Sequence, residues 1–147
     1  MLSETPSSNI FIIDFGLTKK FIDPSTNQHI EYETRKNSGL TGTPRFCSLS
    51  AHKSSTQSRR DDLESLLYIL IYLKDGKLSW QNAKGSTKKE KYENIYQAKR
   101  SISNRELSAG WPEPFYLFCR NIRSLKFKDA PDYTYLSDIL LRCHRQL

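Results

Sequence analysis

The chain has 147 residues, of which 37% are hydrophobic and 27% charged, and this composition is typical of one globular domain rather than of a disordered chain. Its formal net charge of +7 at pH 7 favours an anionic partner such as a phosphopeptide, an acidic protein, a nucleic acid or a membrane surface, although a generally basic, solvated surface would carry the same charge. No apolar run reaches the roughly 18 residues of a membrane-spanning helix, and the polar start is unlike a signal peptide. We therefore expect a cytoplasmic or nuclear protein with no membrane partner.

The cysteines and histidines do not form a recognisable framework. The three cysteines are odd in number and include no Cys-x-x-Cys spacing, and the three histidines are scattered along the chain. Disulfide frameworks use even numbers of cysteines, and zinc sites need ligands at short, regular spacings. Neither kind of site is predicted.

The first third of the chain is predicted to contain one strand and one long loop. Residues 1–8 are rich in Ser, Thr and Pro, which is typical of a loop, and the apolar residues 10–13 are typical of a short buried strand. From Leu17 to about Thr56 the sequence has turn signals but no sustained helical period. We expect a long ordered loop there, which is unusual in a compact domain unless the loop is functional.

Four helices are predicted in the remainder, so the predicted fold class is mainly α. The strongest helix is Asp61–Lys74, with acidic residues in its first turn, where the helix dipole favours them, and Asp75-Gly76 after its end. Because it has apolar residues on nearly all faces, we expect it to be buried on all sides. The others run from Thr87 to about Arg100, where Thr87 and Glu90 match a capping box, from Trp111 to about Leu125, and onward from Asp132 as N-cap.

A chemical motif follows the predicted strand. Asp14-Phe15-Gly16 places an acidic residue at the end of an apolar run, although a three-letter match is weak by itself and a strand-ending turn is the alternative. Its weight comes from the longer runs that follow. These are Leu40–Phe46 (Leu-Thr-Gly-Thr-Pro-Arg-Phe), Gln57–Ser65 (Gln-Ser-Arg-Arg-Asp-Asp-Leu-Glu-Ser), Trp80-Gln81, Thr87–Glu93 and Ala130–Leu136.

With these runs, residues 9–147 resemble the C-terminal part of the catalytic domain of the casein kinase 1 family of Ser/Thr protein kinases. The Ser-Arg-Arg-Asp-Asp-Leu-Glu-Ser run carries the most weight, because most other kinases differ there. The resemblance implies a protein-kinase-like fold and a partial C-lobe with one short strand, an activation segment at residues 14–50 and about four helices. It also implies that residues 1–8 are a loop or an artificial start, and that the N-terminal half of the kinase domain is a missing partner.

The resemblance assigns roles to single residues. Asp14 resembles the aspartate that binds the Mg²⁺ bridging the ATP phosphates, which implies Mg²⁺ and ATP for the complete kinase and no cofactor for this chain alone. Arg45, Lys91 and Lys36 match three basic positions of a pocket that receives a phosphate or acidic group already present on the substrate. Asp62 resembles the aspartate that starts the central helix and holds the backbone of the catalytic loop. The alternatives are solvated surface charge for the basic residues and a first-turn helix acid for Asp62.

Three departures from the family pattern suggest a divergent member. The run Ser48–Ser50 reads Ser-Leu-Ser rather than Ser-Ile-Asn, so the far end of the activation segment loses an anchoring amide. Leu67 stands where a glycine is usual and needs compensating space. Ser38-Gly39 resembles a two-residue insertion, which shifts Lys36 relative to Arg45.

The expected function is that of part of a casein-kinase-1-like kinase, which transfers the γ-phosphoryl group of ATP to Ser or Thr of acidic or pre-phosphorylated proteins. The chain alone is expected to be inactive, because it contains no Gly-rich loop, strand lysine or catalytic-loop base. The alternative is a non-catalytic module of kinase ancestry that binds phosphorylated or acidic segments. Nucleic-acid binding is a third hypothesis, which no sequence signature supports. Because the family neighbours of the Asp61–Lys74 helix are missing, we also expect an exposed apolar patch that binds hydrophobic dyes.

Overall fold

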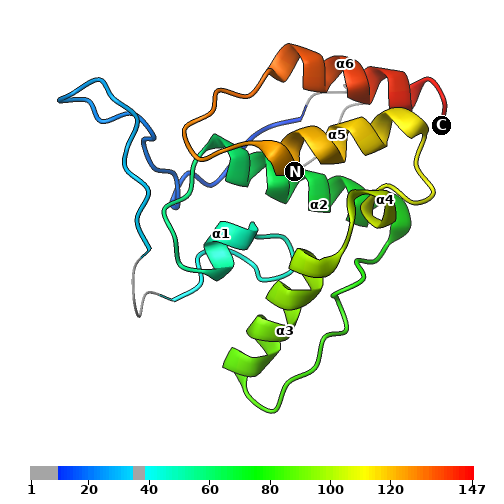
Figure 1. The fold of residues 1–147 in the computed structure, drawn as a ribbon, viewed down its shortest axis with the longest axis horizontal. Helices are drawn as coiled ribbons and strands as arrows, with labels where there is room; N and C mark the ends of the chain where they lie inside the picture. The colour runs from blue at the N-terminus through cyan, green and yellow to red at the C-terminus, as the bar shows by residue number, and fades with distance from the viewer. Residues whose placement is uncertain (1–9, 35–38) are drawn as a thin grey trace. The chain divides into compact units, whose positions relative to one another are not determined.

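The computed structural model describes residues 10–34 and 39–147, which belong to two compact units, residues 1–30 and residues 31–147. The described residues are mainly helical and contain isolated β-bridges but no sheet (Figure 1). The predicted mainly α class is confirmed, whereas its kinase-like arrangement stays a prediction. The helices are α1 (Leu49–His52), α2 (Arg59–Asp75), α3 (Lys88–Ser101), α4 (Asn104–Leu107), α5 (Glu113–Ser124) and α6 (Tyr133–His144).

The prediction of a buried strand at residues 10–13 is wrong. Among these four residues only Ile10 takes part in a bridge, and their side chains are 59% to 84% exposed. A buried strand needs neighbouring strands to pair with its amide and carbonyl groups, and a second layer to cover its side chains. The described residues of the first unit supply neither, since their other regular pairing is a single antiparallel bridge between Ile22 and His29. The apolar run therefore remains in contact with solvent.

In the second unit, helix α5 packs against both α2 and α6, and α1 packs against α2 and α3 (Figure 1). Helix α5 has an apolar face because its hydrophobic residues recur every three or four positions, which brings them to one side of the helix. The core is lined by Leu63, Leu67, Tyr68 and Ile71 of α2, by Phe115, Phe118, Cys119 and Ile122 of α5, and by Leu136, Ile139 and Cys143 of α6.

The central helix α2 extends slightly beyond the predicted Asp61–Lys74. It ends where Gly76 adopts a left-handed conformation with φ of 69°, which glycine reaches without steric cost. Leu67, which was predicted to need compensating space, is fully buried in the core. The prediction that α2 is buried on all sides is wrong, but the predicted apolar patch is present. Leu66, Ile69 and Leu73 are 40%, 37% and 74% exposed and share one face, which no described helix covers.

This apolar stripe of Leu66, Ile69 and Leu73 should bind hydrophobic dyes. Replacing both Ile69 and Leu73 by glutamine is expected to reduce the fluorescence of a bound anilinonaphthalene dye. The denaturation midpoint should change little, because exposed side chains contribute little to the core. As a control, Leu67→Ala in the same helix should lower the free energy of unfolding by about 2–5 kcal/mol. An unchanged dye signal from the double variant would contradict the assignment.

The starts of the other long helices are confirmed in most details. Thr87 accepts the amide hydrogen of Glu90 at the start of α3, and Asp132 accepts that of Tyr135 at the start of α6. The Glu90 carboxylate differs from the predicted capping box, because it accepts the amide hydrogen of Ser86 at 2.6 Å. The sequence did not predict the single-turn helices α1 and α4. The described part of the predicted loop from Leu17 to Thr56 is otherwise irregular.

Candidate anion-binding site

The site is built on a tight turn, Thr43–Cys47, which precedes α1. The carbonyl of Thr43 accepts the amide hydrogens of both Phe46 and Cys47 at 2.9 Å. Gly42 enters the turn with φ of 87°, a conformation that favours glycine. Arg45 lies inside this turn, so its backbone is held by the hydrogen bonds on either side of it.

The Arg45 guanidinium lies against two aromatic rings. Its central carbon is 5.4 Å from the ring centroid of Tyr72 and 5.8 Å from that of Phe46. A cation near an aromatic face is attracted to it, while the edge of the guanidinium keeps its N–H donors free for an acceptor. Arg45 is partly buried, and no acceptor of the described residues binds its guanidinium.

Arg45 differs in this respect from the other partly buried arginines of the described chain. Arg59 donates to the carbonyl of Lys128, and Arg60 donates to Ser50 and to the carbonyl of Leu125. Arg123 donates to the carbonyl of Ile102 and to Asn104. A desolvated guanidinium normally satisfies its donors in this way. The donors of Arg45 are therefore available to a ligand.

Two buried side chains, Lys99 and Trp80, donate hydrogen bonds to the backbone carbonyls of the turn. Lys99 of α3 donates from Nζ to the carbonyls of Pro44 at 2.8 Å and Cys47 at 2.6 Å. Trp80 donates from Nε1 to the carbonyl of Arg45 at 2.8 Å. Sequence reasoning missed both residues. The available signal was that Lys99 interrupts the face of α3 that also carries the buried Ile95.

Burial controls the titration of the groups around Lys99. It lowers the pKa of Lys99 to about 8 and, together with the charge of Lys99, lowers the pKa of His52 to about 4. Burial also raises the pKa of the Cys47 thiol and of the Glu64 carboxyl. At neutral pH the Lys99 ammonium group that binds the turn is therefore charged, whereas the neighbouring His52 imidazole and Cys47 thiol are neutral.

The other two predicted anion ligands, Lys91 and Lys36, are not shown to lie beside Arg45. Lys91 is exposed in the first part of α3, and its side chain has no hydrogen-bond or ion-pair partner among the described residues. It lies eight residues before Lys99, which corresponds to about 12 Å along the helix. The structure gives no contact between Lys91 and Arg45. Lys36 lies outside the described residues.

Asp14 does not form a metal site with the described residues. It belongs to the first unit, is exposed, and has φ of 64°. Its carboxylate accepts the amide hydrogen of Gly16 at 3.2 Å. No group of three or more His, Cys, Asp or Glu side chains within residues 10–34 and 39–147 is placed to hold a metal ion. A single carboxylate does not supply the several oxygen ligands that Mg²⁺ prefers, so the predicted role of Asp14 needs further ligands.

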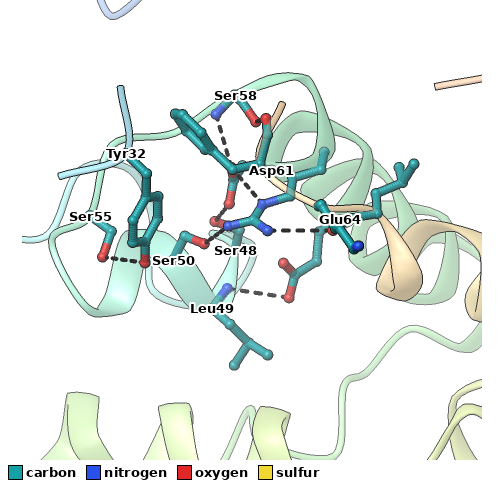
Figure 2. A network of polar contacts seen from close by, with 12 residues as sticks. Tyr32, Ser48, Leu49, Ser50, Ser55, Ser58, Asp61 and Glu64 are labelled. Atoms are coloured by element: carbon teal, nitrogen blue, oxygen red, sulfur yellow. Dashed lines mark hydrogen bonds and ion pairs between the residues drawn. The ribbon is translucent and has the colours of Figure 1, made fainter. Parts of the chain in front are cut away.

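The two acidic residues at the start of α2 have different environments. Asp61 is 1% exposed and accepts hydrogen bonds from the Ser48 hydroxyl at 2.7 Å and from the Ser58 amide at 2.9 Å (Figure 2). Asp62 is exposed, and its carboxylate has no hydrogen-bond partner among the described residues. Partial desolvation and the neighbouring Asp61 charge raise the pKa of Asp62. The described residues thus give the intramolecular role to Asp61, and the role of Asp62 toward a catalytic loop stays a prediction.

The segment after the turn is anchored to α2 through Leu49 and Ser50. Ser50 accepts a hydrogen bond from Arg60 at 3.2 Å, and the amide of Leu49 donates to Glu64 at 3.2 Å (Figure 2). Ser48 also caps α1 by accepting the amide hydrogen of Ala51 at 3.1 Å. The Ser50 hydroxyl and the Leu49 amide thus both bind side chains of α2. This fixes the segment beyond Arg45 to the central helix.

Comparison with known proteins leaves the family open. No protein-family model matches the chain. No helix among the described residues has both the length and the apolar character needed to cross a bilayer.

Proposed function

We propose that the chain supplies the activation segment and part of the helical C-lobe of a casein-kinase-1-like Ser/Thr kinase. The complete enzyme transfers the γ-phosphoryl group of Mg-ATP to Ser or Thr of acidic or pre-phosphorylated proteins. Within it, Arg45 binds a phosphate or carboxylate already present on the substrate and so directs the substrate chain. The observation that carries this proposal is Arg45 itself, a partly buried arginine on Tyr72 whose donors meet no acceptor of the described residues.

The chemistry of a guanidinium explains the choice of ligand. Two parallel N–H donors match two oxygens of a phosphate, and charge-assisted bonds of this kind are roughly twice as strong as neutral ones. The net charge of the whole chain, +7, attracts an anionic substrate over a longer range. Both effects raise the affinity for a pre-phosphorylated segment over its unmodified form.

The phosphoryl transfer itself requires groups that this sequence does not contain. Phosphoryl transfer depends on positioned Mg²⁺, a lysine on the phosphates and an aspartate on the substrate hydroxyl. The proposed contribution of the chain is therefore recognition. The second candidate, a non-catalytic phosphopeptide-binding module, rests on the same Arg45 observation. It predicts that adding the N-terminal half of a related kinase restores no Asp14-dependent transfer, whereas the kinase proposal predicts that such transfer appears.

Arg45→Ala should weaken the binding of an acidic peptide carrying one phosphoserine by about tenfold or more, because the loss of a bidentate contact costs at least about 1.4 kcal/mol. Isothermal titration of the 147-residue protein measures this. Arg120→Ala is the matched control, since Arg120 is exposed on α5 and its loss removes the same charge. It should change the affinity less than about twofold. Equal affinities of wild type and Arg45→Ala would contradict the proposal.

A further inference from the structure

We propose that Lys99 and Trp80 are positioning residues that set the direction of the Arg45 side chain, an inference that rests on the function proposed above. Neither residue reaches the surface: Lys99 is 0% exposed and Trp80 is 1% exposed. They act through the backbone of the turn and do not touch the anion. We refer to the two side chains together as the carbonyl clamp.

The clamp fixes both peptide planes that meet at Arg45. The Pro44 carbonyl lies in the plane before the Arg45 Cα and accepts a hydrogen bond from Lys99, and the Arg45 carbonyl lies in the plane after it and accepts one from Trp80. Because peptide units are planar, holding both carbonyls restricts both backbone dihedrals of Arg45. The backbone then fixes the direction of the Arg45 Cα–Cβ bond, and the guanidinium carbon lies 5.4 Å from the ring centroid of Tyr72. Lys99 closes the far end of the turn by also binding the Cys47 carbonyl.

The cost of burying Lys99 supports a specific role for its ammonium group. No acidic side chain of the described residues lies within ion-pair distance of Nζ. The charge is instead stabilised by the two carbonyl dipoles, by the rings of Tyr68 and Trp80, whose centroids lie 4.9 Å and 5.4 Å from Nζ, and by the more distant Glu64. A buried charge without a counter-ion is costly, and methionine would fill a similar volume without that cost. The carbonyls that Lys99 holds therefore account for the choice of lysine.

The clamp also explains how a loop can hold a binding residue at one position. An unrestrained arginine loses side-chain and backbone freedom when it binds an anion, which reduces affinity. Donors that already hold the backbone remove part of this loss before the ligand arrives. The stacking of Arg45 on Tyr72 then limits the remaining side-chain rotations.

The test compares four variants of the full chain: Lys99→Met, Trp80→Phe, Arg45→Ala and the double variant Lys99→Met/Arg45→Ala. Binding of the phosphoserine peptide should fall about fivefold in Lys99→Met and about threefold in Trp80→Phe, each corresponding to the loss of one or two hydrogen bonds. In the double variant, Lys99→Met should cause no loss beyond that of Arg45→Ala, because a positioning residue acts through the residue it positions. Independent, additive losses would overturn the inference.

A second readout separates positioning from general destabilisation. Hydrogen exchange at the amides of Phe46 and Cys47 should become faster in both clamp variants. Ile139→Ala, in the core of α6, should lower stability without changing peptide affinity or making exchange at these two amides selectively faster. If Lys99→Met fails to fold, Trp80→Phe still carries the test, since it keeps an aromatic ring and removes the N–H donor.

The outcomes separate the two levels of the proposal. If Arg45→Ala leaves the affinity unchanged, the proposed function fails. If Arg45→Ala weakens binding while both folded clamp variants bind as well as wild type, the proposed function stands and the clamp is overturned.

Discussion

Replacing Asp61 by alanine should lower the free energy of unfolding by about 3 kcal/mol, because removing a buried carboxylate leaves its partners without an acceptor. The Ser48 hydroxyl, on a fully buried residue, and the Ser58 amide would both lose their hydrogen-bond acceptor. The variant also disconnects the end of the turn segment from α2, since Ser48 is the N-cap of α1. Urea denaturation followed by circular dichroism measures the loss.

The neighbouring Asp62 provides a matched control for this loss. Asp62→Ala removes the same charge one position along the same helix, yet it should change stability by only about 0.5 kcal/mol. Similar losses from the two variants would show that the effect comes from net charge or helix dipole rather than from the buried hydrogen bonds. Asp61→Asn is informative as well, because its amide oxygen can satisfy one donor but not both carboxylate contacts.

The second large effect concerns the pH dependence that Lys99 imposes on stability. Burial lowers its pKa from 10.5 to about 8, so between these values the unfolded chain binds a proton that the folded chain has released. Stability therefore rises with pH through this window, and the full penalty is present below pH 8. At about 1.4 kcal/mol per pH unit, the rise should approach about 3 kcal/mol.

The comparison of wild type with Lys99→Met isolates this contribution. The variant retains the groups that face Lys99, which are Cys47, Glu64, Tyr68 and His52. Burial raises the pKa of the Cys47 thiol and of the Tyr68 phenol, so these two groups make stability fall as the pH rises, in both proteins. Chemical denaturation at several pH values between 7.5 and 10.5 should give a difference between wild type and variant that shifts in favour of wild type as the pH rises. Parallel curves would mean that Lys99 is not desolvated in the folded protein.

The features that could be predicted from the sequence are those that local chemistry decides. The left-handed glycine after α2, the Thr87 cap of α3 and the Asp132 cap of α6 each depend on residues a few positions apart. The apolar face of α5 likewise follows from its own spacing. For these elements, tertiary structure adds packing but does not change the local preference.

The features that could not be predicted depend on partners far away in the sequence. The residues at 10–13 have the composition of a buried strand, but burial requires other strands that the described chain does not supply. In the sequence, Asp61 and Asp62 are equivalent acidic residues of a first helical turn. Only the structure shows that Ser48, thirteen positions before Asp61, donates its hydroxyl hydrogen to Asp61. Lys99 resembles a surface lysine unless the carbonyls more than fifty residues before it are known to approach it.

The most direct test of the account is nuclear magnetic resonance of the Arg45 side chain during titration with the phosphoserine peptide. We expect the Arg45 Nε–H resonance to shift with the same dissociation constant that calorimetry gives, and the unphosphorylated peptide to cause a much smaller shift. The α3 backbone amides near Lys91 should shift less. A titration in which those α3 amides shift while the Arg45 resonance stays in place would contradict the account, because the peptide would then be held by surface lysines.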